Sequence, residues 1–222
     1  MIDADDTLWE NNVYFELAFD QFIDFLDHSS LTPVEVRTIL DEIELANIKV
    51  HGYGAENFAR NLCQCYQRLV EREIEPYDTE RIMSLAAEIM QQPVEIIEGV
   101  QSTLEYLSMR HDLTLFTKGH AEEQKLKIDR SGLEIYFGHT AIVREKDRES
   151  YAQLVRERGL DPSRTWMIGN SPKSDINPAL AAGLNAVFVP HDRTWHLEKT
   201  ELGSGTGRLI VVERFADLAK HF

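Results

Sequence analysis

The chain has 222 residues, 43% of them hydrophobic and 27% charged, which is enough for one or two globular domains and excludes a disordered protein. It carries 23 Lys and Arg against 38 Asp and Glu, so its formal net charge is −15, and we expect neither a nucleic acid nor an anionic membrane as partner. It has no apolar run of membrane-spanning length and its acidic first residues do not resemble a signal peptide, so we expect a cytoplasmic protein, either monomer or homodimer.

The first part of the chain, residues 11–92, has the hydrophobic spacing of helices nearly throughout, and turn residues divide it into four predicted helices. Thr32 is a candidate N-cap of the second helix, with Glu35 as its capping-box partner. We expect the third helix over residues 55–73 and Asp78 as the N-cap of the fourth.

From about residue 98 onwards, short apolar strands alternate with helices. The strands are expected at residues 113–117, 140–143, 165–169, 186–189 and 209–212, and the helices at residues 99–110, 121–131, 147–158 and 173–182, with a final helix after the last strand. Strands that alternate with helices predict a parallel sheet covered by helices on both faces.

Three aspartates lie at the start of the chain, and two of them, Asp3 and Asp5, are two residues apart. In an extended segment such residues point to the same side, so both carboxylates would face one point. Converging carboxylates repel each other unless a cation lies between them, and Mg²⁺ suits such a site because it prefers oxygen ligands. A solvated acidic segment explains these residues equally well.

Polar residues also follow three of the predicted strands. The segment 169–175 offers oxygen ligands from Asn170 and Asp175, the turn after residue 117 offers the Thr117 hydroxyl and backbone N–H groups, and Lys146 supplies a positive charge. Taken alone, Thr117 could be a helix cap and Lys146 a surface lysine. Because the carboxyl ends of parallel strands meet at one edge of a sheet, their combination predicts a single site.

These residues resemble the motifs of the haloacid dehalogenase-like hydrolase superfamily. Its four motifs would be Asp3-Ala4-Asp5-Asp6-Thr7-Leu8, then Thr117, then Lys146, then Gly169-Asn170-Ser171 through Asp175. The resemblance implies an α/β fold, with a Rossmann-like doubly wound parallel sheet and an inserted all-helical cap domain. It places the core domain at residues 1–11 and 97–222 and the cap domain at residues 12–96.

The resemblance also implies roles for the acidic residues. Asp3 would be the nucleophile that attacks phosphorus to form an aspartyl-phosphate. Asp5 would protonate the leaving oxygen and then take a proton from the hydrolytic water. Mg²⁺ would be held by the side chain of Asp3, the backbone carbonyl of Asp5, and either Asn170 or Asp175.

The remaining motifs would bind the phosphoryl group. The hydroxyl of Thr117 and the backbone N–H groups of Lys118 and Gly119 would hold its oxygens, and Lys146 would offset its charge. The acidic residue at Asp5 favours a phosphate ester over a haloacid substrate, because an alkoxide needs a proton to leave and a halide does not. The predicted function is therefore a Mg²⁺-dependent phosphatase, a phosphoric monoester hydrolase, for a small phosphorylated metabolite.

Two alternatives to this function stay open. One is a phosphosugar mutase of the same superfamily, which would exclude water and hold a bisphosphate. The other is a catalytically impaired protein that keeps the fold for a binding or regulatory role.

Two residues depart from the superfamily pattern. Asp6 stands where a small residue, often Gly, is usual, which is tolerable if its side chain points away from the metal. Asn170 replaces the commoner Asp and lacks its charge, so we expect lower metal affinity unless Asp175 or Asp6 compensates.

The third departure is the short segment before the nucleophile. Only Met1 and Ile2 precede Asp3, whereas strands usually have about five or six residues. Either this start lies too far downstream or a partial strand suffices. A stub in the middle of the sheet would leave backbone groups unpaired on both neighbouring strands. We therefore expect lower activity or metal binding than in a chain with about four more residues upstream.

The substrate's leaving part is expected to meet the cap. His51 and Tyr53, in the turn between the second and third predicted helices, are the candidate lid residues that contact it. The alternative is that Tyr53 packs in the cap interior and His51 is exposed to solvent.

Overall fold

The computed structural model describes all 222 residues, and these form two compact units. One unit comprises residues 1–12 and 94–222, and the other comprises residues 13–93. None of the helices combines the length and the apolar character that a membrane span requires.

The second unit is entirely helical. Its four helices are α1 (Asn12–Leu26), α2 (Pro33–His51), α3 (Ala55–Leu69) and α4 (Pro76–Gln91). They enclose one hydrophobic core, whose largest fully buried side chains are Phe22, Leu40, Ile43, Leu62 and Ile82. The predicted helical character of this part of the chain is confirmed, because each helix places its apolar face on this core.

The ends of these helices show which of the predicted N-caps form. The capping box of Thr32 and Glu35 is confirmed, since the Thr32 side chain accepts from the backbone N–H of Glu35 and the Glu35 side chain accepts from that of Thr32. Asp78 as N-cap is wrong. The helix begins at Pro76 after Glu75, and the Asp78 carboxylate reaches back to the backbone N–H of Glu75 at 2.8 Å. The first turn of a helix tolerates proline, because an N–H group at that position would have no partner within the helix. The helix therefore begins at Pro76, earlier in the chain than predicted.

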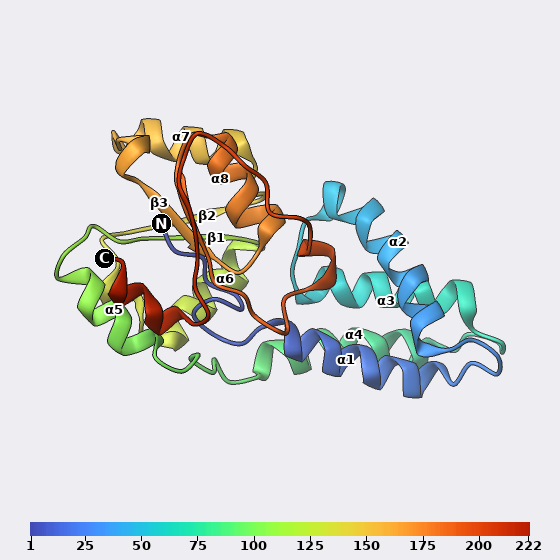
Figure 1. Cartoon of the computed structure of the whole chain (residues 1–222). Coiled ribbons are helices and arrows are strands. Elements are labelled where there is room, and N and C mark those ends of the chain that lie inside the picture. Colours follow the sequence, from blue (N-terminus) through green and yellow to red (C-terminus); the bar gives the residue numbers. More distant parts are fainter. The chain divides into compact units, whose positions relative to one another are not determined.

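The first unit is an α/β structure (Figure 1). Its elements are α5 (Val100–Ser108), β1 (Thr114–Lys118), α6 (Ala121–Ser131), β2 (His139–Val143), α7 (Arg148–Arg158), β3 (Trp166–Gly169), α8 (Asn177–Ala181), β4 (Asn185–Phe188) and β5 (Leu209–Val211). Short 3₁₀ helices occupy residues Glu134–Tyr136, Pro162–Arg164, His196–Glu198 and Phe215–Lys220, the last of which is η5. All strand pairs are parallel, β1 with β2, β3 with β4, and β4 with β5.

The segment Met1–Asp3 joins the two groups of strands. The backbone of Ile2 bridges Leu115 of β1 on one side and Ile168 of β3 on the other. Ile2 donates to Thr114 O at 2.8 Å, and Asp3 donates to Ile168 O at 2.9 Å. The expectation that this stub leaves backbone groups unpaired on both neighbouring strands is wrong along Met1–Asp3, because this segment exchanges backbone hydrogen bonds with β1 and with β3.

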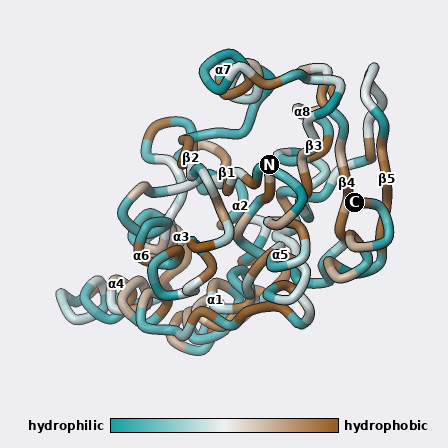
Figure 2. The backbone as a smooth tube through the Cα atoms, turned by 90° about the vertical axis from the view of Figure 1, so that its left-hand side faces the viewer, coloured by the Kyte–Doolittle hydropathy of each residue, from teal (hydrophilic) through white to brown (hydrophobic).

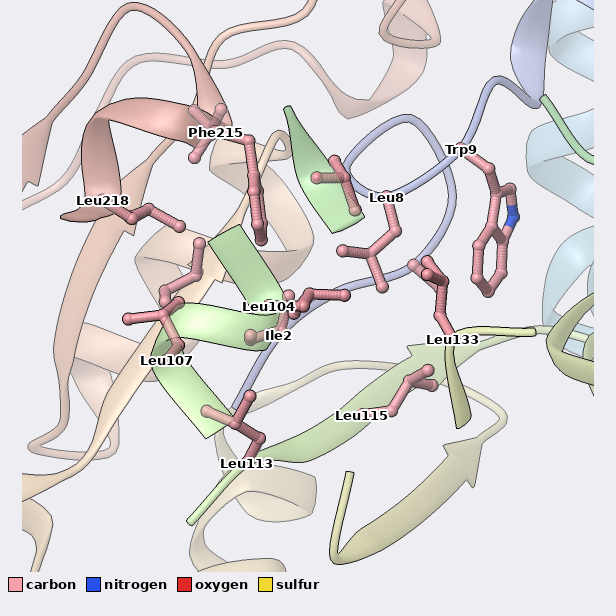
Figure 3. Close-up of a cluster of buried hydrophobic side chains, with 14 of the residues drawn as sticks. Ile2, Leu8, Trp9, Leu104, Leu107, Leu113, Leu115, Leu133, Phe215 and Leu218 are labelled. Atoms are coloured by element: carbon pink, nitrogen blue, oxygen red, sulfur yellow. The ribbon is translucent and has the colours of Figure 1, made fainter. Parts of the chain in front are cut away.

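Hydrophobic side chains alternate between the two faces of the sheet. On one face, α5, α6 and η5 cover Ile2, Leu115 and Ile168. Figure 3 shows Ile2 and Leu115 in this cluster, together with side chains of α5 and η5. On the other, α7 and α8 cover Phe116 and Met167. Figure 2 shows hydrophobic residues along β4 and β5. Burial on both faces explains the nearly continuous apolar runs of the strands and confirms the predicted doubly wound α/β fold.

One predicted helix is divided. Residues 173–182 were expected to be continuous, but a π-helical turn (Pro172–Ile176) precedes α8. The physical reason is Pro178, whose nitrogen cannot donate to the carbonyl of Ser174 four residues earlier. That carbonyl instead accepts the hydroxyl of Tyr151 at 2.9 Å.

Candidate active site

The predicted site residues come from the carboxyl ends of several parallel strands. Asp3 ends the central segment, Thr117 lies near the end of β1, and Lys146 follows β2. Asn170 follows β3 directly. Parallel strands with helical crossovers bring these ends to one edge of the sheet, which is why residues far apart in the sequence meet there.

A buried ammonium group joins two buried carboxylates at this edge. Lys146 Nζ donates to Asp3 Oδ1 and, at 2.8 Å, to Asp175 Oδ1. The side chains of Lys146 and Asp175 are each only 1% exposed. Burial, together with the nearby charge of Asp3, raises the pKa of Asp175 to about 7, although Lys146 opposes the shift. Two carboxylates share one ammonium here, so a further positive charge would be stabilised in this cluster.

Thr7 connects the nucleophile candidate to the fourth motif. Its hydroxyl lies 3.0 Å from both Asp3 Oδ2 and Asn170 Oδ1. The amide nitrogen of Asn170 donates to Thr194 Oγ1 at 2.7 Å. Thr194 therefore orients Asn170, whose oxygen shares the Thr7 hydroxyl with Asp3 Oδ2.

The turn after β1 differs in part from the predicted phosphate-binding turn. The Gly119 N–H donates to Val143 O at 3.0 Å and so extends the pairing with β2, and its contact with phosphate stays a prediction. Because N–H groups alternate sides along a strand and Phe116 donates to Ile2 O, the N–H of Lys118 points toward the central segment. Thr117 is 1% exposed, and its hydroxyl lies 3.4 Å from Gln124 Oε1.

The side chain of Lys118 takes part in a network that the sequence did not predict. Its Nζ donates to Glu198 Oε1 at 2.8 Å and to Ser174 Oγ at 2.7 Å. Glu198 also accepts from Ser171 Oγ at 2.6 Å. Lys118, Ser171 and Ser174 outweigh the effect of burial and lower the pKa of Glu198. This carboxylate ties the turn after β1 to the segment that carries Asp175.

The carboxylate of Asp5 accepts hydrogen bonds from a different set of residues than the carboxylate of Asp3. Its carboxylate accepts from Lys127 Nζ, Gln124 Nε2 and Trp9 Nε1. Burial alone would raise the pKa of Asp5, but these donors outweigh it and lower that pKa. No motif in the sequence indicated Gln124 or Lys127.

Asp6 occupies the position where glycine is usual, and its backbone has a positive φ of 58°. Aspartate tolerates this conformation better than most residues, because its short side chain bonds to nearby backbone. Here the carboxylate accepts the N–H groups of Asn11 at 2.8 Å and Asn12 at 3.0 Å. Beside it, Glu10 Oε1 lies 3.3 Å from His191 Nε2. The Asp6 side chain thus binds backbone N–H groups at the start of α1 and forms no hydrogen bond with the cluster around Asp3.

The family model that matches this chain is that of the haloacid dehalogenase-like hydrolases, over residues 2–189. The chain belongs to this family. The match contains all four of the motifs described above, and the helical unit stands where the family carries its cap domain. The search of curated proteins found no matching relative.

Solved structures share the fold of this hydrolase over nearly its whole length. A haloacid dehalogenase-like family hydrolase from Xanthomonas campestris is 31% identical, with a TM-score of 0.86, covering 99% of this chain and 88% of its own. The magnesium-bound protein YfnB from Bacillus subtilis is 16% identical, with a TM-score of 0.70 and coverage of 99% and 96%. A predicted phosphoglycolate phosphatase from Haemophilus somnus is 16% identical, with a TM-score of 0.65 and coverage of 99% and 95%.

Haloacid dehalogenases are also among the solved structures with this fold. The fold alone therefore does not separate phosphate ester hydrolysis from dehalogenation, and the choice rests on the residues of the site.

The two candidate lid residues of this hydrolase lie in the helical unit. His51 is the last residue of α2 and is exposed, and Tyr53 lies half-buried in the following turn. The side-chain amide of Asn57 holds this turn by donating to His51 O at 2.6 Å and to Tyr53 O at 3.3 Å. Contact of His51 and Tyr53 with substrate stays a prediction.

Proposed function

We propose that this hydrolase is a Mg²⁺-dependent phosphatase that cleaves a small phosphorylated metabolite through an aspartyl-phosphate on Asp3. The observation that supports the proposal is that the carboxylates of Asp3 and Asp5, two residues apart, have separate sets of partners. Asp3 is paired with a buried ammonium, and Asp5 is surrounded by hydrogen-bond donors. The first suits a nucleophile. The donors around Asp5 hold its carboxylate in place and favour its ionised form, which suits a base that takes a proton from water; Asp5 must carry a proton when the leaving oxygen departs.

The donor set fits Mg²⁺. The side-chain oxygens of Asp3 and Asn170 that contact Thr7 lie on one side of the cluster, and Asp175 supplies a further carboxylate next to it. All of these are hard oxygen ligands, which Mg²⁺ prefers. Asp3, the backbone carbonyl of Asp5, and either Asn170 or Asp175 would hold the ion. When bound, it would neutralise the charge on the phosphoryl oxygens.

The residues of the chain would then act in two steps. In the first, a carboxylate oxygen of Asp3 forms a bond to phosphorus, the bond from phosphorus to the leaving oxygen breaks, and Asp5 gives that oxygen a proton. In the second, Asp5 takes a proton from water, the water oxygen bonds to phosphorus, and the bond to Asp3 breaks. Lys146 offsets negative charge on Asp3, and Thr117 contacts the transferring group.

The test is phosphate release from a panel of small phosphate esters, measured with Mg²⁺ and with a chelator. We expect release only with Mg²⁺, and we expect Asp3→Asn to lower it by at least about 1,000-fold. Asp112→Asn, at an exposed position, is the matched control and should keep full activity. Beryllofluoride should bind the unaltered chain at Asp3, which gives a readout of the nucleophile that does not depend on turnover.

Other results would favour other functions. Isomer formation without net phosphate release would indicate a phosphosugar mutase. Metal-independent halide release from a 2-haloacid would indicate a dehalogenase and would contradict the role given to Asp5. An unaltered chain that releases phosphate from no ester and binds no beryllofluoride would indicate a binding or regulatory protein.

A further inference from the structure

Three side chains hold the Asp5 carboxylate by both of its oxygens. Lys127 Nζ lies 2.6 Å from each oxygen. Gln124 Nε2 donates to Oδ2 at 2.8 Å, and the indole nitrogen of Trp9 donates to Oδ1, also at 2.8 Å. The side chains of Asp5 and Lys127 are 21% and 19% exposed, so solvent screens this pair only in part. The carboxylate therefore has a defined position before any substrate arrives.

Two of these partners come from the same face of α6. Gln124 and Lys127 are three residues apart, a spacing that places both side chains on one side of a helix. Gln124 is buried, and it contacts two groups of the proposed site. Its amide nitrogen reaches Asp5, and its amide oxygen lies 3.4 Å from the Thr117 hydroxyl. One side chain thus connects the proposed acid–base residue to the proposed phosphate-binding residue.

Gly119 makes room for this connection. Its φ is +139°, and a Cβ atom at this position would lie 2.9 Å from Gln124 Nε2. The glycine therefore allows the amide of Gln124 to pass close to the turn after β1. The same Nζ of Lys127 also lies 3.0 Å from Asn11 Oδ1, and this third contact helps to fix the ammonium.

We infer that Lys127 is a positioning residue for proton transfer by Asp5, and that together with Gln124 it holds the Asp5 carboxylate at a fixed place beside Thr117. The inference rests on the proposed phosphatase function and deepens it. No hydrogen bond joins Lys127 to Asp3, Lys146 or Asp175, so we expect it to act on the reaction through its contact with Asp5. Esters whose leaving oxygen needs a proton should depend on this residue, and esters with a good leaving group should not.

The experiment compares leaving groups. The values of kcat and KM are measured with Mg²⁺ for 4-nitrophenyl phosphate, for phenyl phosphates with poorer leaving groups, and for an alkyl phosphate. In Lys127→Met we expect kcat/KM for the poorest leaving groups to fall about 30-fold through kcat, with less than about threefold change for 4-nitrophenyl phosphate. Lys127→Arg should recover most of the loss, because it restores a cationic donor.

The matched control is Lys125→Met, an exposed lysine on the same helix, which should behave as the unaltered chain. In an Asp5→Asn background, Lys127→Met should cause no further loss, because the residue it positions is gone. Thermal melting and beryllofluoride binding at Asp3 show whether each variant is folded.

The outcomes separate this inference from the proposed function. An equal loss on all leaving groups, or no loss on any, overturns the role of Lys127 while the phosphatase stands. If Lys127→Met fails to fold, Lys127→Gln takes its place and must show the same dependence on the leaving group. Absence of phosphate release from every ester by the unaltered chain overturns both.

Discussion

Asp175 in the α/β unit and Glu44 in the helical unit are both buried carboxyl groups with a raised pKa, but their surroundings differ. Asp175 accepts hydrogen bonds from Lys146 at 2.8 Å and from the Ser171 N–H at 2.9 Å. Glu44 is 6% exposed on α2, and its Oε2 has no hydrogen-bond partner. Burial raises the pKa of Glu44 to about 8, against the opposing effect of Arg37.

The difference shows how the partners of a buried carboxyl group decide its charge. Asp175 has an ammonium and a backbone N–H as donors, so its charged form is stabilised against the effect of burial. The helical unit buries Glu44 without such donors, and the neutral acid is favoured there. The charged form of Asp175 is therefore accessible near neutral pH, whereas ionisation of Glu44 lowers the stability of the fold as pH rises toward 8.

The largest effect is expected from Lys146→Met, which leaves the buried carboxylates of Asp3 and Asp175 without the cation between them. Removal of one partner from a buried pair costs about 3–5 kcal/mol, so the free energy of unfolding in urea should fall by that amount. The exposed Lys125→Met should change it by less than about 0.5 kcal/mol. A fall below about 1 kcal/mol in Lys146→Met would show that the α/β unit does not depend on this cation.

The second prediction concerns pH and the helical unit. The pKa of Glu44 is raised from 4.5 to about 8 in the folded chain, so the folded state binds more protons between these values. Stability then decreases as pH rises from 4.5 to 8. Glu44→Gln lacks this penalty, and its advantage in free energy of unfolding should grow by about 3 kcal/mol between pH 5 and pH 8.

The control for this prediction is Glu42→Gln, an exposed position on the same helix. It should show no such dependence. Urea unfolding at several pH values measures both variants. A constant difference between Glu44→Gln and the unaltered chain at all pH values would mean that Glu44 is charged in the folded state.

The smallest effects are expected from two glycines with positive φ, one in each unit. Gly119→Ala should cost about 1–3 kcal/mol, because the new Cβ is strained and meets Gln124. Gly52 has a φ of +76° and open space around it, so Gly52→Ala should cost only about 1 kcal/mol. Thermal unfolding compares them. Equal costs would show that backbone conformation alone, without the contact to Gln124, decides the effect at Gly119.

Much of the fold was predictable because it depends on local signals. The helical pattern of residues 11–92, the capping box at Thr32 and the alternation of strands and helices each follow from spacing or from a short motif. The places where prediction failed depend on backbone groups that a pattern does not show. The start of α4 at Pro76 and the π-helical turn before α8 are both consequences of a proline's missing N–H.

The candidate site, like the fold, was predictable only in part. The order of the motifs along the chain led to the prediction that Asp3, Lys146 and Asp175 share a site, and the structure brings their side chains into contact. Glu198 and Gln124 carried no signal, because each is an ordinary polar residue in its own stretch of sequence. The sequence also did not show that the Gly119 N–H pairs with Val143, or that the missing side chain of Gly119 makes room for Gln124.

The sequence by itself determined the type of each element, the parallel α/β architecture and the residue types available for chemistry, because periodicity and strand-end motifs are properties of neighbouring residues. Only the tertiary structure decided which donor meets which carboxylate. Lys127 reaches Asp5 across 122 positions of the chain, and Lys146 reaches Asp3 across 143. Such pairs form because several strands and helices pack at once, and no stretch of sequence contains both partners.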